Sequence, residues 1–286
     1  MEALLSHSFD YLSSYESGKI RKGLRQIEGL LAQICLSSSN PSPPDRRRNA
    51  SQGHRLAPPK RLESLREDPA FREFFKLQEG FQWNVALRLI SCLERLLGKG
   101  SNGQNDLLII ATLDLIQGAL LLHPPSRCLF AREIYMNLLL DLLDPCNCPA
   151  IQSSTLLTLV CALLDQPRNT RTFEILEGLL TVTSLFKMRS TSREVKIKLV
   201  EFLYFYLMPE TAPLGLNKSA LATPVVQRTP SRLGGLSRSA SGGAQRDLDD
   251  TRTTEQKQAL LGKFLNNVED LVADLRDNAP FEGTVY

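Results

Sequence analysis

The sequence predicts an all-α fold built as a helical-hairpin solenoid that is armadillo/HEAT-like. Apolar residues recur at helical spacing over most of the chain, in segments of roughly 14 to 17 residues that are too long for typical strands. Short connectors rich in Pro, Asn and Asp separate these segments, as in helical hairpins. The rhythm of about 20 residues per helix is typical of solenoids with repeats of about 40 residues.

The first part of the chain is predicted to hold two amphipathic helices within residues 1–36, with a break at Ser17 and Gly18. Residues 37–60 are rich in Ser, Pro and Arg and have almost no apolar side chains, so we expect a disordered loop. The basic cluster within it, residues 46–48, fits either a solvated loop or a contact with phosphate or a partner.

Helical periodicity resumes after this loop and continues through the middle of the chain. GKGSNG at residues 98–103 formally matches the dinucleotide-binding pattern, but that pattern needs a preceding strand and a helix precedes it here. We therefore predict a turn. The segments expected to be helical are residues 61–98, 106–122, 128–144, 151–164 and 173–186.

The next helix is predicted to begin near Ser192, whose hydroxyl can cap it, and to stop at Pro209. Its two sides are both apolar, which predicts an inner helix packed between two neighbours. The alternative is that its second side meets a partner. The first side carries Val195, Leu199, Phe202, Leu203 and Tyr206. The second side carries Ile197, Val200, Tyr204 and Leu207, of which Ile197, Val200 and Tyr204 are the candidate partner surface.

The end of the chain is predicted to be a disordered tether over residues 211–253 and a helix over residues 254–277. We expect that helix to dock on the helical body, residues 1–210, because its apolar face is costly to leave in water. Thr223, Thr229 and Ser241 in the tether are candidate phosphorylation sites. Pro follows each threonine, and an Arg lies three residues before the serine. Phosphate there would convert the basic tether to a neutral or acidic one and could thereby alter docking of the last helix.

Composition excludes few classes of function. The 286 residues carry a formal net charge of +3, too mild to indicate nucleic-acid binding by itself. Six cysteines without a secretory signal fit reduced intracellular thiols. The longest apolar run, residues 107–122, contains Asp114 and Gln117 and is shorter than the ~20 residues of a membrane span, so we expect a core helix and no transmembrane segment.

Catalytic and metal-binding motifs are not recognisable. The three histidines are scattered, and Cys146 and Cys148 lack the second pair that a zinc site needs. The Walker, nucleophile-elbow, kinase and phosphatase patterns are missing. We expect no catalytic residues, cofactor or metal. Two alternatives stay open: an enzyme without a short motif, and a nucleic-acid or anionic-membrane binder that uses residues 46–48 and 228–238.

Several short runs resemble the fungal cell division control protein 14 family, the septation initiation network component that is unrelated to the phosphatase of similar name. The most specific run is EFLYFYLMPE at residues 201–210. The others are LFARE at 129–133, TFE at 172–174, EGL at 177–179, LFK at 185–187, VKIKL at 195–199, residues 257–275 and PF at 280–281.

This resemblance implies a non-catalytic protein that binds a Ste20-like (germinal-centre) kinase of the septation initiation network and supports its activity. It further implies a cytoplasmic protein that localises with the kinase to the spindle pole body during division. The family brings no catalytic residues with it, and no residue-level partner surface.

Overall fold

The computed structural model describes residues 1–36, 60–98, 103–210, 251–266 and 268–269. Within these ranges the chain is mostly helical and contains no strand, which confirms the predicted all-α class. The helices are α1 (Glu2–Leu12), α2 (Ser17–Cys35), α3 (Leu62–Glu67), α4 (Pro69–Gln78), α5 (Val85–Gly98), α6 (Asp106–Leu122), η1 (Pro124–Ala131), α7 (Glu133–Asp141), α8 (Pro149–Leu163), α9 (Pro167–Ile175), α10 (Gly178–Lys187), α11 (Arg193–Leu207) and α13 (Thr254–Leu261).

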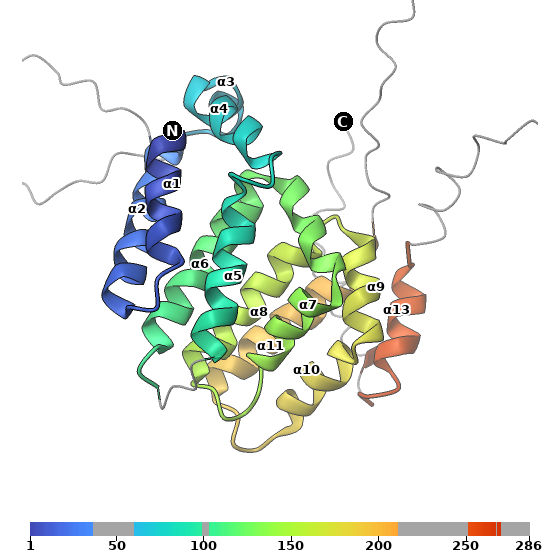
Figure 1. Ribbon diagram of the computed structural model, residues 1–286. Coiled ribbons are helices and arrows are strands. Elements are labelled where there is room, and N and C mark those ends of the chain that lie inside the picture. Colours follow the sequence, from blue (N-terminus) through green and yellow to red (C-terminus); the bar gives the residue numbers. More distant parts are fainter. Residues whose placement is uncertain (37–59, 99–102, 211–250, 267, 270–286) are drawn as a thin grey trace, which may run out of the picture.

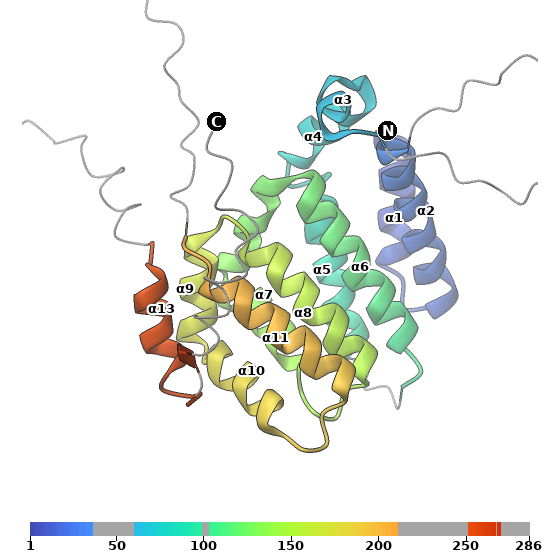
Figure 2. The same ribbon diagram turned by 180° about the vertical axis from the view of Figure 1, so that it is seen from behind.

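The helices form two layers (Figures 1 and 2). Helices α2, α6, α8 and α11 pack side by side in this order and form the rear layer, seen from behind in Figure 2. In the front layer α1 contacts α5, η1 contacts α9, and α9 contacts α10, while α5 packs on α6 and α7 on α8. Several pairs of consecutive helices also pack together, as in a hairpin arrangement: α1 with α2, α5 with α6, α7 with α8, α8 with α9, and α9 with α10. The narrower armadillo/HEAT-like assignment stays a prediction.

The central helix is α8, which lies between α6 and α11. Most of its side chains are buried, including serines and threonines. Thr155 and Thr158 donate hydrogen bonds to backbone carbonyls one turn earlier, at 2.7 and 2.9 Å, so these hydroxyls are satisfied inside the core.

Helix α11 is the last helix of the rear layer, and the prediction that it is buried on both sides was wrong. Ser192 caps its start, accepting a hydrogen bond from the Val195 N–H at 3.3 Å, and the helix ends before Pro209. The face toward α8 is buried. On the other face Ile197 is 51% exposed, and Val200 and Tyr204 are half-buried. Only one side of α11 has a neighbour in the rear layer, so Ile197 on the second side is exposed and Val200 and Tyr204 are partly exposed, whereas Leu207 at the end of that side is buried.

Two segments predicted to be single helices are divided. Residues 128–144 contain the end of the 3₁₀ helix η1 and then α7, and Arg132 between them has extended backbone. Residues 173–186 contain the end of α9 and then α10, separated at Glu177, which has a φ of 58°. A left-handed residue cannot continue an α-helix, so the chain changes direction there.

The described residues on either side of each low-complexity segment are in contact with each other. Lys60 donates its backbone N–H to the Cys35 carbonyl at 2.8 Å, which closes the first segment. Arg252 donates its backbone N–H to the Glu210 carboxylate at 2.8 Å, which closes the second. The predicted loop and tether themselves, residues 37–59 and 211–250, lie outside the described residues.

Within the described ranges, no single helix is long and apolar enough to cross a membrane. Helices α6 and η1 reach the length and apolar composition of a membrane span only when they are taken together, and the chain bends by 119° at their junction. In α6 the apolar residues that are buried in the protein core are Leu108, Ile109, Leu113, Ile116, Ala119 and Leu120.

Candidate functional site

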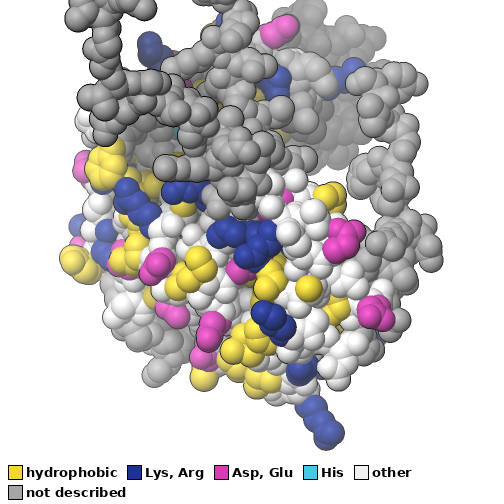
Figure 3. All heavy atoms as spheres, turned by 90° about the vertical axis from the view of Figure 1, so that its right-hand side faces the viewer, with side chains coloured by type: hydrophobic (Ala, Val, Ile, Leu, Met, Phe, Trp, Pro, Cys, Tyr) yellow, Lys and Arg dark blue, Asp and Glu magenta, His cyan; other side chains and the backbone are white. Residues whose placement is uncertain are grey.

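A cluster of charged side chains holds the C-terminal segment on the helical body. Helix α13 lies on the side of the molecule that faces the viewer in Figure 3, where Lys and Arg side chains lie beside Asp and Glu side chains. Arg171 and Glu174 belong to α9, Glu210 follows α11, and Arg252 and Lys257 belong to the C-terminal segment. Arg171 pairs with Glu210 at 2.6 Å and with Glu174 at 3.2 Å, and Lys257 pairs with Glu210 at 3.0 Å. Arg252 pairs with Glu174. Both carboxylates are largely buried, so their charges depend on these partners.

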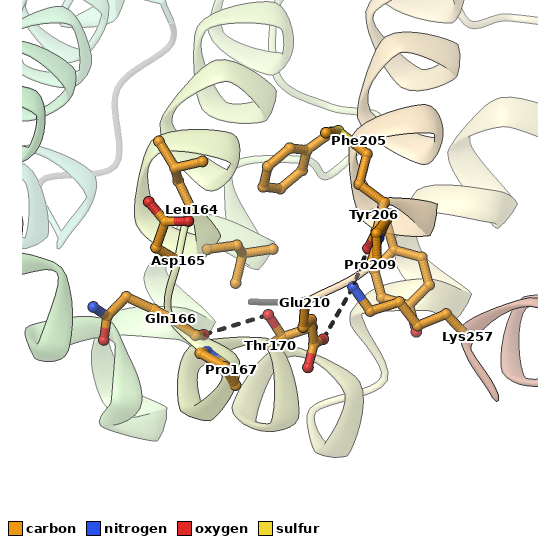
Figure 4. A pocket seen from close by; sticks show the side chains of 12 residues that line it. Leu164, Asp165, Gln166, Pro167, Thr170, Phe205, Tyr206, Pro209, Glu210 and Lys257 are labelled. Atoms are coloured by element: carbon orange, nitrogen blue, oxygen red, sulfur yellow. Dashed lines mark hydrogen bonds and ion pairs between the residues drawn. The ribbon is translucent and has the colours of Figure 1, made fainter. Parts of the chain in front are cut away.

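Glu210 is the centre of this charged cluster. Its Oε1 accepts from Arg171 and Lys257, and its Oε2 accepts the backbone N–H of Arg252. Figure 4 shows the Lys257 ammonium group beside the Glu210 carboxylate; the same group donates to the Met208 carbonyl at 2.9 Å. One carboxylate therefore joins α9, the end of α11 and α13.

Burial and pairing shift the titration of these groups in opposing directions. Burial raises the pKa of Glu174, while the hydrogen bond from Tyr206 and the charges of Arg171 and Arg252 lower it. Burial also raises the pKa of Tyr206, whose hydroxyl donates to Glu174 at 2.7 Å. Burial lowers the pKa of Lys257, while the hydrogen bond and the negative charge of Glu210 act to raise it. The cluster holds opposite charges in contact, an arrangement suited to fixing the C-terminal segment in place.

Aromatic packing positions the helices that carry the cluster. The Phe173 ring lies 5.6 Å from the Phe202 ring and 6.5 Å from the Tyr206 ring, between centroids. At the start of α10, a Cβ on Gly178 would lie 2.3 Å from the Phe173 ring, so only glycine fits. The runs TFE, EGL and EFLYFYLMPE, far apart in sequence, therefore meet at this one place.

A surface cavity of about 190 Å³ lies next to the charged cluster (Figure 4). The turn between α8 and α9, the end of α11 and Lys257 of α13 form its walls. The lining residues are Leu163, Leu164, Asp165, Gln166, Pro167, Thr170, Phe205, Tyr206, Met208, Pro209, Glu210 and Lys257.

Helix α13 packs against α11 and is shorter than the predicted helix over residues 254–277. It ends at Leu261, and the following turn buries Leu265 and Val268. Thr253 caps the helix together with Gln256 in a reciprocal capping box. Residues 270–277 lie outside the described residues.

A second polar cluster surrounds His123, which is buried in the core. Its Nδ1 lies 2.7 Å from the Ser126 hydroxyl, and that hydroxyl accepts from Asn84 at 2.8 Å. The Nε2 atom is buried without a hydrogen-bond partner in the protein. Burial lowers the pKa of His123 to about 4. Cys146 and Cys148 are free thiols, and in the described part of the chain no three His, Cys, Asp or Glu side chains are placed to hold a metal ion.

The sequence-predicted site residues fall in two places. Ile197, Val200 and Tyr204 lie on the outer side of α11, while Thr223, Thr229 and Ser241 lie outside the described residues, as do the basic segments 46–48 and 228–238. Sequence reasoning did not single out the charged cluster. Its signal was present as Glu174, Glu210 and Lys257, charged residues next to strongly apolar runs.

The fold and this site define an all-helical protein whose C-terminal segment is fastened to its body by buried ion pairs. The chain belongs to the family described as cell division control protein 14, SIN component, whose model matches residues 1–281. It is 28% identical over 290 residues to the cell division control protein 14 of Schizosaccharomyces pombe (strain 972), which covers 98% of this chain and 97% of that protein. The predicted family is thereby confirmed. No solved structure matches the chain.

Proposed function

We propose that this protein is a non-catalytic regulatory or scaffold subunit that binds a Ste20-like (germinal-centre) kinase and supports its activity in the septation initiation network. It thereby promotes septum formation and cytokinesis, as a cytoplasmic protein that reaches the spindle pole body during division. The observation that carries the proposal is the match of residues 1–281 to a family of SIN components in cell division control.

The outer side of α11 supports a role in binding a protein partner. Ile197 is 51% exposed there, with the half-buried Val200 and Tyr204 one and two turns further on. Apolar residues that stay exposed or partly exposed along one helix face are typical of surfaces that a partner covers. This stripe is the candidate partner surface, and Figure 2 shows its helix on the outside of the rear layer.

Gel filtration of the full chain with the purified kinase, followed by a kinase assay with and without the chain, tests the proposal. We expect a complex that elutes earlier than either protein and a higher phosphorylation rate. Ile197→Glu is expected to weaken the complex. Ile134→Glu is its matched control, because Ile134 is 61% exposed but lies on α7 in the front layer. The proposal is wrong if the wild-type chain gives neither a complex nor a change in rate.

A further inference from the structure

The cavity beside the charged cluster has the size of one side chain. Its volume of about 190 Å³ is below the roughly 300–1,000 Å³ of typical small-molecule and cofactor pockets. A single large side chain of a partner fits this volume, and buried side chains in such pockets are the usual anchors of protein interfaces.

The walls of the cavity select an uncharged side chain. Leu163, Leu164, Phe205, Met208 and Pro209 supply apolar surface. The three charged residues of the lining each have an opposite charge within 4 Å: Lys257 and Glu210 pair with each other at 3.0 Å, and Asp165 pairs with Arg127 at 3.6 Å. A charged guest would lose its hydration without gaining an unpaired counter-charge, whereas an apolar guest would bury its surface.

The cavity continues the apolar stripe on the outer side of α11. Ile197, Val200, Tyr204 and Met208 follow one another at spacings of three, four and four residues, which places them along one helix face. Met208 lines the cavity and is 48% exposed. A polypeptide that lies along the stripe therefore reaches the cavity at the end of the helix.

We propose that this cavity is an anchor pocket for one large uncharged side chain, aromatic or branched aliphatic, of the polypeptide that binds along α11. The inference rests on the proposed function, since it takes the kinase as that polypeptide. Lys257 of α13 forms one wall, so the pocket is complete only while the C-terminal segment is docked. Binding of the anchor and docking of α13 therefore favour each other.

Isothermal titration calorimetry of the full chain with the purified kinase tests the pocket. Leu164→Trp fills the cavity from its wall, and Met208→Glu places a carboxylate at its mouth. Each is expected to weaken binding by about tenfold or more, the loss typical of a blocked interface anchor. Met188→Glu is the matched control, because Met188 is also a partly exposed methionine directly after a helix, α10, and does not line the cavity. We expect it to bind within about twofold of wild type.

Two further measurements separate the pocket from the proposed function. Thermal unfolding shows whether Leu164→Trp folds. If it does not, Met208→Glu still tests the pocket, because Met208 is exposed and its substitution should not disturb the fold. In the complex, amide hydrogen exchange over residues 254–261 should slow, because the anchor stabilises the docked α13. If the kinase binds the wild-type chain and both pocket variants equally well, the pocket is wrong and the proposed function stands. If the kinase does not bind the wild-type chain, both are overturned.

Discussion

Glu210 stands out among the individual residues because three groups from two distant parts of the chain, α9 and the C-terminal segment, converge on its carboxylate. Breaking a buried ion pair on one side is costly, since the remaining charge keeps its desolvation penalty without its partner. Removing the Glu210 charge leaves Lys257 without a carboxylate partner and Arg171 with Glu174 alone. An exposed ion pair on α11, the helix that precedes Glu210, provides a direct comparison.

We expect Glu210→Gln to lower the free energy of unfolding by about 3 kcal/mol, the low end of the range for buried pairs, because Glu174 still faces Arg171. The control is Glu201→Gln, which removes an exposed ion pair with Lys198 and should change stability by less than about 1 kcal/mol. Urea unfolding followed by circular dichroism measures both. Equal effects of the two variants would contradict the central role of Glu210.

His123 gives the protein a predictable response to acid. Its pKa is about 4 in the folded chain and about 6.5 when unfolded. As the pH falls below 6.5, the unfolded chain takes up a proton that the folded chain does not, so stability is lost between pH 6.5 and 4. From pH 7.5 to 5.0 this amounts to about 2 kcal/mol.

The variant His123→Gln removes that proton uptake. We expect its loss of stability between pH 7.5 and 5.0 to be smaller than that of the wild type by about 2 kcal/mol. Urea unfolding at the two pH values measures the difference, in which the other titrating groups cancel. An equal loss in both proteins would contradict the lowered pKa, because it would mean that His123 takes up a proton in the folded chain as readily as in the unfolded chain.

At the scale of elements, the sequence predicted which segments are helical better than which helix is central. The helix over residues 192–208 is apolar on two sides, so double burial was expected, but α11 has a neighbour in the rear layer on one side only. Helix α8 takes the central place although it carries many hydroxyls, because Thr155 and Thr158 donate to its own backbone and Ser154 donates to Asp114 of α6. Periodicity shows which faces are apolar; it does not show which face will have a neighbour.

Helix α13 depends on docking for its structure. With eight residues it is too short to be stable alone in water. Its attachment includes the buried Lys257 and Leu261, whereas Lys263 just beyond it is exposed. The same charge reversal at these two lysines should therefore have very different effects.

We expect Lys257→Glu to undock α13, because it places a carboxylate against Glu210 inside the body. Amide hydrogen exchange over residues 257–261 should then approach that of an unstructured chain, while the amides of α6 and α8 stay protected. Lys263→Glu should leave exchange in α13 unchanged. Retained protection of α13 in Lys257→Glu would mean that its apolar contacts hold it without the ion pairs.

For the molecule as a whole, the class of fold was predictable and the candidate site was not. The site joins residues that are 32 to 78 positions apart, such as Tyr206 with Glu174 and Arg252 with Glu174. A single sequence shows that a charge such as Glu210 lies beside an apolar run, but not which distant charge will meet it. The family-like runs TFE and EFLYFYLMPE contain Glu174, Tyr206 and Glu210. The role of these three residues in the site nevertheless follows only from how the helices pack.

The two low-complexity segments offer a test at this scale, because the residues that flank each of them are already in contact. Replacing residues 211–250 by a Gly/Ser linker of about ten residues should keep the fold and raise the free energy of unfolding by about 1 kcal/mol, since a shorter loop costs less entropy to close. The same replacement of residues 37–59 should give a smaller gain, because that segment is shorter. Urea unfolding measures both gains, and hydrogen exchange in α13 shows whether docking persists. A clear loss of stability in either variant would contradict the predicted disorder, because it would mean that the deleted residues pack against the body.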